Sequence, residues 1–231
     1  MSTATFEVPG LPLPVQLRRM RTARVMRLRV DHDRGLLKLT APARTAPRHA
    51  LRWAEQQRPW VDAQLASAPA ARPFEDGATI PVEGRDVHIQ WIGGKRGVRL
   101  EGHTLLVGGL AESLSRSVAR WLQDEARVIL SAETGRVAEI AGVSVRSVSI
   151  GDPVSRWGSC SSSGSIRYSW RLIMAPPECL RFVVAHEVAH RTHMNHGPAF
   201  KRLEAALFGG PVASARHLLR KWSPALRAVG R

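Results

Sequence analysis

The sequence predicts an α+β protein, with a sheet-rich N-terminal part at residues 1–109 and a helix, sheet, helix part at residues 110–231. Three observations support this. Short β-prone segments separated by glycine turns fill the first half. From Ala111 onward, apolar residues recur mostly at three- and four-residue steps, which is typical of helices. A later segment, residues 180–189, is apolar nearly all round, as in a buried helix. Strands and helices that segregate along a chain indicate the α+β class.

The first elements of the N-terminal part are expected to be short strands followed by a helix. Turn-forming residues at 31–35 join the second strand to the third. Thr45 can cap the helix and Pro47 suits its first turn, while Pro59 can break it before its end near Ser67. The three strands are expected at Val15–Arg18, Arg24–Val30 and Leu36–Thr40.

The rest of the N-terminal part begins with a linker rich in alanine and proline at residues 68–73. Beyond it, four segments have the length and composition of strands, and glycine turns at 93–94 and 102–103 separate the last three. These strands are expected at residues 80–82, 87–92, 98–100 and 104–107.

The C-terminal part is expected to contain a long amphipathic helix, a small sheet and then further helices. The sheet would include a strand at 145–150 and a hairpin that runs from Arg156 through the turn 161–164 to a strand at 166–172. An exposed strand here could also pair with an extended peptide. The helices are expected at residues 113–140, through the apolar segment, from Pro198 to the stop at Gly209-Gly210, and at 213–222.

The apolar segment carries the most informative motif, His186-Glu187-Val188-Ala189-His190. Residues i and i+4 of an α-helix share a face, so His186 and His190 can bind one metal ion. Glu187 lies beside them and can take a proton from a water held by that ion. We therefore interpret the motif as a zinc site with Glu187 as the catalytic base.

The third metal ligand is expected to be His196. If the helix continued, His193 would share the face, but it would lie ~10 Å from His186 along the axis at ~1.5 Å per residue. Nitrogens only about 2 Å from one zinc ion cannot come from that distance. Residues 195–198 are typical of a turn, which allows the His196 ring to come back towards the ion. Three histidines leave the fourth position to water, as in catalytic zinc sites.

Three residues near this motif have two interpretations each. Cys160 could supply a thiolate ligand, as in a deformylase-like site, but a buried small residue is the simpler interpretation. His193 is interpreted as a solvent-facing residue or a partner of a ligand before a catalytic one. Arg156 could stabilise an oxyanion or bind a substrate carboxylate, although a salt bridge that supports the fold is the more common use.

Taken together, these motifs resemble the YgjP-like family of zinc metallopeptidases, which is related in motif to the SprT-like and WLM proteases. The resemblance implies a minimal zincin fold, with His186, His190 and His196 as zinc ligands and Glu187 as the base. The sequence departs from the family pattern at Tyr168-Ser169 and at Lys201, and it lacks the methionine turn of metzincins. The matching residues are 156–161, 166, 170–173, 175–177, 183–190 and 195–200.

Composition and charge limit the partners and the compartment. The chain has 231 residues, two cysteines and a net charge of +15. No apolar run is long enough to span a membrane and the N-terminus lacks a secretory signal, so a cytoplasmic protein with no membrane partner is expected. The basic surface could bind nucleic acid, and Arg27 and Arg29 would share one strand face there. With thirty arginines and four lysines, the charge also reflects a general arginine bias.

Three function classes follow from these observations. The leading one is a zinc-dependent peptidase acting on a peptide or protein substrate, in which Glu187 activates water. The second is a hydrolase of a non-peptide amide that uses the same site. The third is a nucleic-acid-associated protein, or a protease of DNA-bound proteins, that uses the basic surface.

Overall fold

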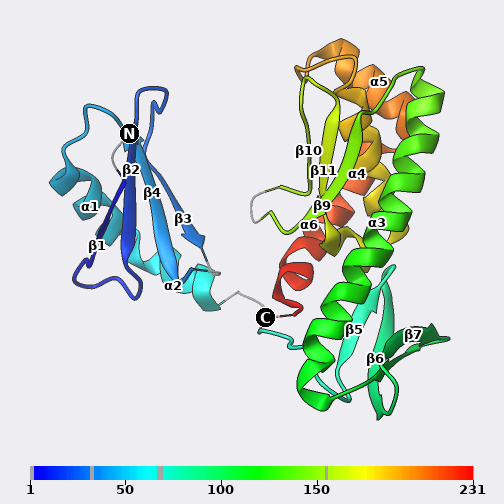
Figure 1. Cartoon of the computed structure of the whole chain (residues 1–231). Coiled ribbons are helices and arrows are strands. Elements are labelled where there is room, and N and C mark those ends of the chain that lie inside the picture. The colour runs from blue at the N-terminus through cyan, green and yellow to red at the C-terminus, as the bar shows by residue number, and fades with distance from the viewer. Residues whose placement is uncertain (1–2, 32–33, 67–69, 154–155, 231) are drawn as a thin grey trace. The chain divides into compact units, whose positions relative to one another are not determined.

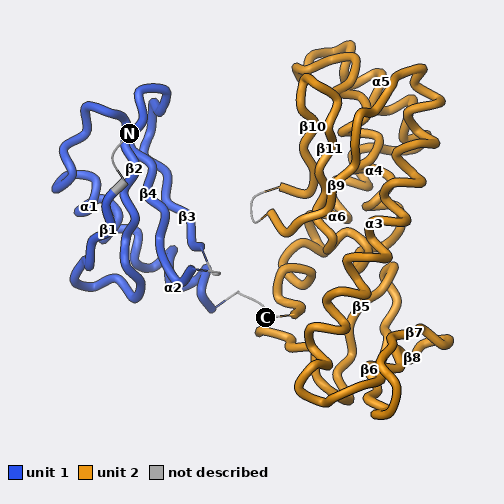
Figure 2. The backbone as a smooth tube through the Cα atoms, viewed as in Figure 1, with its two compact units in different colours: residues 1–68 blue, residues 69–231 orange. Residues whose placement is uncertain are grey.

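The computed structural model describes residues 3–31, 34–66, 70–153 and 156–230, and the chain divides into two compact units, Met1–Ala68 and Pro69–Arg231 (Figure 2). Each unit has its own apolar core. The division falls at the expected linker, residues 68–73, of which 68 and 69 lie outside the described residues. The boundary expected after residue 109 lies inside the second unit, because Leu105 and Val107 before it share a core with Val118 and Leu122 after it.

The first unit is a four-stranded sheet covered by two short helices (Figure 1). Strand order is β1-β2-β4-β3, with β2 and β4 parallel and the two outer pairs antiparallel. Alternate residues such as Leu37 and Leu39 are fully buried against Ala50 and Ala54 of the first helix. The elements are β1 (Thr3–Phe6), β2 (Val15–Met20), β3 (Arg27–Asp31), β4 (Leu36–Pro42), α1 (Pro47–Gln56) and α2 (Arg58–Ala66).

Three expectations for this unit differ from the structure, the first being that the strand expected from Arg24 begins only at Arg27. Strand β1 was not predicted, since it is only four residues long and shows no clear alternation. Ala46, not Thr45, occupies the N-cap of α1, and no side chain caps the helix. Pro47 opens α1 as expected, and the break near Pro59 separates α1 from α2. Arg27 and Arg29 both lie on the exposed face of β3.

The second unit begins with a sheet of the same topology. Its order is β5-β6-β8-β7, again with a parallel central pair and antiparallel outer pairs. The strands are β5 (Thr79–Val82), β6 (Arg85–Gly93), β7 (Gly97–Glu101) and β8 (Thr104–Gly108), close to the four segments predicted. The chain therefore forms one strand arrangement twice, although the two sequences show no repeat.

A long helix connects this sheet to the rest of the unit. Helix α3 (Leu114–Ala141) packs against β7 and β8 near its start and against β9 near its end (Figure 1). The three-stranded sheet has the order β10-β11-β9, in which β10 is an edge strand. Helix α4 lies between α3 and the last two helices. The remaining elements are β9 (Ser147–Gly151), β10 (Gly158–Cys160), β11 (Ser165–Ser169), η2 (Trp170–Met174), α4 (Pro177–Ala189), α5 (Pro198–Phe208) and α6 (Val212–Ala228).

The structure corrects two boundaries in this region. The strand expected at 166–172 ends at Ser169, because Trp170–Met174 form a 3₁₀ helix in which all five side chains are buried. The last helix continues past Trp222 to Ala228, with Pro224 inside it. The α+β class and the helix, sheet, helix order of α3, the three-stranded sheet and α4 are confirmed. None of the described helices is both long and apolar enough to cross a bilayer.

Candidate functional site

Helix α4 places two of the three predicted ligands in the interior of the second unit. Pro177 occupies its first turn, where a missing N–H costs nothing, and Glu178 complements the positive end of the helix dipole. The helix is buried on nearly all sides by α3, α5, α6 and β10. It ends at Ala189, so His190 lies at its C-cap and the chain turns immediately after this residue.

The turn after α4 returns His196 to the face of the helix. The Asn195 side chain accepts a hydrogen bond from the Gly197 N–H at 3.1 Å, which stabilises the turn expected there. Pro198 then starts α5. The ring of Phe200, which is 1% exposed, lies with its centroid 4.6–5.1 Å from the centroids of all three imidazoles. Phe200 therefore supports the histidine cluster from one side.

The three histidines come together as the spacing predicted. One nitrogen from each of His186, His190 and His196 lies within 4.8 Å of the others. The Nε2 atoms of His186 and His196 are 3.3 Å apart. Two nitrogens that bind one tetrahedral zinc ion at about 2.0–2.1 Å are also separated by about 3.3 Å. The donor set and its spacing therefore fit a zinc ion.

Two of these rings are held by hydrogen bonds on the opposite nitrogen. His186 Nδ1 is 2.7 Å from Oε1 of Glu204, a residue of α5 that is only 2% exposed. His190 Nδ1 is 3.0 Å from the carbonyl oxygen of His193. Both acceptors require a proton on Nδ1, which leaves Nε2 as the free ligand atom. Burial lowers the pKa of His186, while Glu204 acts in the opposite direction.

Glu187 lies against the edge strand β10. Its side chain is 5% exposed, and it accepts a hydrogen bond from the backbone N–H of Cys160. Burial raises the pKa of Glu187 to about 7, although Arg156 and the Cys160 N–H both act to lower it. Gly158 makes this approach possible, because a Cβ there would lie 2.6 Å from Oε1 of Glu187. A carboxyl group of this pKa can both accept and return a proton near neutral pH.

A cavity of about 500 Å³ opens beside this cluster, and His186, Glu187 and His196 contribute to its wall. Phe182 and Phe200 add apolar surface to the wall, and Trp157 and Leu219 extend it. Three cationic side chains also line the cavity: Arg156, Lys201 and Arg216. Such a cavity, with a few convergent polar groups, is typical of a substrate site.

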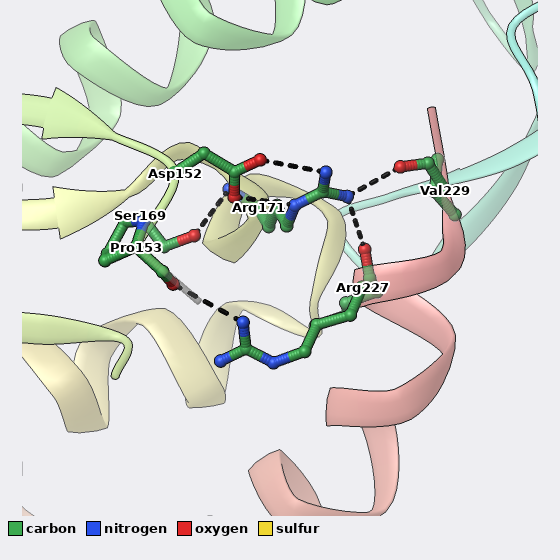
Figure 3. A network of polar contacts seen from close by, with 7 residues as sticks. Asp152, Pro153, Ser169, Arg171, Arg227 and Val229 are labelled. Carbon is green, nitrogen blue, oxygen red and sulfur yellow. Dashed lines mark hydrogen bonds and ion pairs between the residues drawn. The ribbon is translucent and has the colours of Figure 1, made fainter. Parts of the chain in front are cut away.

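The segment that carries Arg156 and Trp157 is attached to the C-terminal helix α6. Trp157 donates from Nε1 to the Ser223 hydroxyl at 3.2 Å, and the Arg227 guanidinium lies 4.7 Å from the Trp157 ring centroid. Arg227 also donates to the Pro153 carbonyl oxygen at 3.4 Å (Figure 3). Helix α6 thereby holds one side of the cavity in place.

Buried Arg171 ties the same helix end to the sheet (Figure 3). Its guanidinium donates to both carboxylate oxygens of Asp152, at 2.8 and 3.0 Å. It also donates to the carbonyl oxygens of Leu226 and Val229, at 2.8 and 2.6 Å. This network fixes the end of α6 beside the end of β9, which Asp152 directly follows.

Cys160 and His193 were each given two interpretations above. Among the described residues, the only cluster of three or more possible metal ligands is His186, His190 and His196, and it includes neither of them. The His193 side chain is half-buried, and only its carbonyl oxygen takes part in the site. Arg156 forms no ion pair or hydrogen bond with a described residue, so the supporting salt bridge considered for it is not observed there. Instead its charge acts on Glu187.

Sequence reasoning missed two residues of this site. Glu204 lies eight residues after His196 on an amphipathic helix. A glutamate on such a helix is ordinarily expected on the exposed polar face, so the sequence did not indicate that Glu204 is buried in the site. An isolated acidic residue on the same face as Phe200 was the available signal, because positions i and i+4 of a helix lie together. For Gly158, nothing in the sequence beyond its position in the predicted hairpin indicates that a glycine is needed there.

Comparison with known proteins gives one family and one structure. A family model described as "YgjP-like, metallopeptidase domain" matches residues 24–221. The crystal structure of the metallopeptidase zymogen of Pyrococcus abyssi abylysin is similar at 19% identity, with a TM-score of 0.36, over 42% of this chain and 95% of that chain. No curated protein gives a significant match. Because the family model covers most of the sequence, the chain belongs to the YgjP-like family of metallopeptidase domains.

Proposed function

We propose that this metallopeptidase domain is a zinc-dependent peptidase in which His186, His190 and His196 bind the ion and Glu187 is the general base. The observation that carries the proposal is the convergence of the three imidazoles next to a cavity whose wall includes His186, Glu187 and His196. All three ligands are neutral nitrogen donors, a set that suits zinc. Three protein ligands also leave a coordination position open, as catalysis requires.

The chain's own residues would orient the substrate and move the proton. Zinc bound here would polarise the scissile carbonyl and make water more acidic. Glu187 would take the proton from the attacking water and deliver it to the leaving amine. Its place under β10, fixed by the Cys160 N–H, keeps the carboxylate on the cavity side of α4. Arg156 would stabilise the negative charge that develops on the carbonyl oxygen.

A peptide substrate is preferred over another amide because the family is one of metallopeptidases. The position of β10 agrees with this choice. It is the edge strand of its sheet and lies next to Glu187, so an extended peptide could pair alongside it. Binding of nucleic acid by the basic surface stays a prediction, as does cleavage of an amide that is not a peptide bond.

The proposal is tested by measuring zinc per chain together with peptide cleavage. We expect one equivalent of zinc in the wild type and in Glu187→Gln, because the glutamine removes only the base. Cleavage of a diverse peptide library should fall by about 10²–10⁴-fold in Glu187→Gln, the usual contribution of general base catalysis. In His196→Ala, both zinc content and cleavage should be lost.

Two matched variants control for nonspecific effects. His193→Ala removes a neighbouring imidazole whose ring is outside the metal cluster, and Cys160→Ala removes the alternative ligand. Both should retain one zinc per chain. Loss of zinc in Cys160→Ala but not in His196→Ala would overturn the ligand assignment, and full cleavage by Glu187→Gln would overturn the assignment of the base.

A further inference from the structure

We propose that the cavity beside the three histidines binds a substrate carboxylate, supplied either by an acidic side chain next to the scissile bond or by the free C-terminus of a peptide. The inference rests on the proposed function, because that function brings substrate into this cavity. It adds a substrate class, peptides that present a carboxylate within reach of Lys201 and Arg216.

The first support is the set of cations in the cavity wall. Arg156, Lys201 and Arg216 come from three separate segments: the residues before β10, helix α5 and helix α6. The Lys201 ammonium forms no ion pair or hydrogen bond with a described residue. All three residues are exposed as well as lining the cavity, and like charges gathered in one cleft attract an anion.

The carboxylates of the site neutralise these cations only in part: Arg216 forms an ion pair with Glu204 at 3.4 Å, whereas Lys201 forms none with a described residue. Glu204 is almost fully buried and already accepts from His186 at 2.7 Å and from Arg216 at 3.4 Å. Glu187 lies under β10, where the Cys160 N–H holds it. Lys201 therefore remains available to a ligand, and the Arg216 guanidinium retains donors beyond its single long contact.

The second support is the apolar path between the metal ligands and Arg216. The Phe182 ring lies 6.2 Å from the His186 ring, measured between centroids, and the Arg216 guanidinium lies 5.6 Å from the Phe182 centroid. An aromatic face therefore leads from the histidines to the cation. A glutamate side chain matches this arrangement, because its methylenes can contact the ring while its carboxylate reaches the positive charge.

Other side chains fit the cavity less well. A lysine or arginine of the substrate would bring a further positive charge next to Lys201 and Arg216, which is unfavourable at short distance. A neutral side chain would use the aromatic surface but would form no charge-assisted hydrogen bond. The structure therefore favours a carboxylate over a carboxamide of the same shape.

The experiment uses hydroxamates, because this group binds zinc and so fixes where the rest of the molecule lies. The probes are peptidomimetic hydroxamates that are identical except for a glutamate, glutamine or lysine side chain. A second pair differs only in a C-terminal carboxylate or carboxamide. Dissociation constants are measured by calorimetry on the full-length, zinc-loaded chain. We expect at least one carboxylate probe to bind about 10-fold or more tightly than its carboxamide partner.

The variant Lys201→Met removes the unpaired charge and keeps most of the side-chain length. We expect it to reduce the ratio of carboxylate to carboxamide affinity several-fold, and Lys201→Glu to reverse the preference towards the lysine probe. Lys95→Met and Lys95→Glu are the matched controls, since Lys95 lies on the turn between β6 and β7 and is not part of the cavity wall. Their ratios should equal that of the wild type.

The outcomes distinguish the two sources of the carboxylate, and they also distinguish failure of this inference from failure of the proposed function. A preference confined to the side-chain series identifies an acidic residue as the ligand, and one confined to the terminal series identifies a peptide C-terminus. Equal affinity for carboxylate and carboxamide probes in a zinc-loaded chain would overturn the inference and leave the proposed function standing. A chain that takes up no zinc would overturn the proposed function and, with it, this inference.

Discussion

Glu204 orients the His186 ring within the proposed metal site. Its carboxylate is buried, accepts from Nδ1 of His186 and is itself contacted by Arg216. A carboxylate in this position fixes the tautomer and the orientation of a ligand ring and makes the ligand more basic. The spacing of His186, His190 and His196 could be predicted from the sequence, but this partner could not, because its contact depends on how α5 packs on α4.

We expect Glu204→Gln to weaken zinc binding by about 10-fold and Glu204→Ala by up to about 100-fold. The glutamine can still accept from His186 but lacks the charge, whereas the alanine leaves Nδ1 without its partner. The measurement is zinc affinity by competition with a chelator. Glu133→Gln, which breaks an ion pair with Arg136 on α3, is the control and should leave the affinity unchanged. Equal zinc affinity in all three variants and the wild type would show that Glu204 does not position His186.

Gly158 is required by the position of Glu187, which gives a second prediction. In Gly158→Ala, the new methyl group would lie 2.6 Å from Oε1 of Glu187, so the carboxylate must move. A displacement of about 1 Å at a catalytic group can cost about 100-fold in rate. We expect cleavage to fall by that order while zinc content stays at one per chain, because no ligand is on β10.

Gly135→Ala is the control for this substitution. Gly135 is an exposed residue of α3, and a Cβ there would meet nothing within 4 Å. It should increase stability slightly, by about 0.5–1 kcal/mol, since alanine favours the helix more than glycine does. If Gly158→Ala cleaved the peptide library at the wild-type rate, Glu187 would not act from the position that the structure gives it.

At the scale of elements, the sequence predicted most helices and strands, and the differences have packing causes. The strand expected at 166–172 ends three residues early because Trp170 and Leu172 are both buried in a 3₁₀ turn. Alternation along the sequence cannot distinguish this turn from a strand with one buried face. Helix α6 extends to Ala228 because tertiary contacts of its last turn, chiefly those of Arg171, compensate for Pro224 inside it.

Arg171 should therefore contribute strongly to the stability of the second unit (Figure 3). Its side chain is 3% exposed and satisfies the carbonyl oxygens of Leu226 and Val229 as well as Asp152. In Arg171→Met these carbonyls lose their donor, and we expect a loss of about 3 kcal/mol in the free energy of unfolding. Urea denaturation, monitored by circular dichroism, measures the change.

Asp152→Asn provides the comparison for this prediction. Asp152 is 40% exposed, so its loss of charge is partly compensated by water, and the carbonyl contacts of Arg171 remain. We expect a loss of less than about 1.5 kcal/mol. A loss in Asp152→Asn as large as that in Arg171→Met would show that the ion pair, and not the attachment of α6, dominates the network.

At the scale of the whole molecule, the chain forms the same four-stranded arrangement twice but uses the two copies differently. The first sheet has its own core with α1 and α2, whereas the second shares a core with the helices that carry the proposed metal ligands. The turn between β5 and β6 also contacts the chain just before α4, since the Glu83 and Gly84 N–H groups donate to the Ile173 and Met174 carbonyls at 2.7 and 3.1 Å. Composition indicated a sheet-rich half, but these long-range contacts left no local signal in the sequence.

This organisation predicts which fragments of the chain can fold alone. A fragment of residues 69–231 should unfold in one cooperative transition and bind one zinc ion, because its core and all three histidines are intact. A fragment of residues 110–231 lacks the strands that carry Ile80, Ile89, Leu105 and Val107, all nearly fully buried. At roughly 1.5–3 kcal/mol for each buried side chain, their loss approaches the whole stability of a typical domain, about 5–15 kcal/mol.

Thermal unfolding by circular dichroism, with zinc content measured on the same samples, distinguishes the two fragments. We expect a sharp transition for residues 69–231 and none for residues 110–231, which should also bind zinc weakly because α3 and the segment before α4 lose their packing partners. A cooperative transition and full zinc binding in residues 110–231 would place the domain boundary after residue 109, as the sequence pattern alone suggests. Failure of residues 69–231 to fold would instead show that the metal site depends on the first unit.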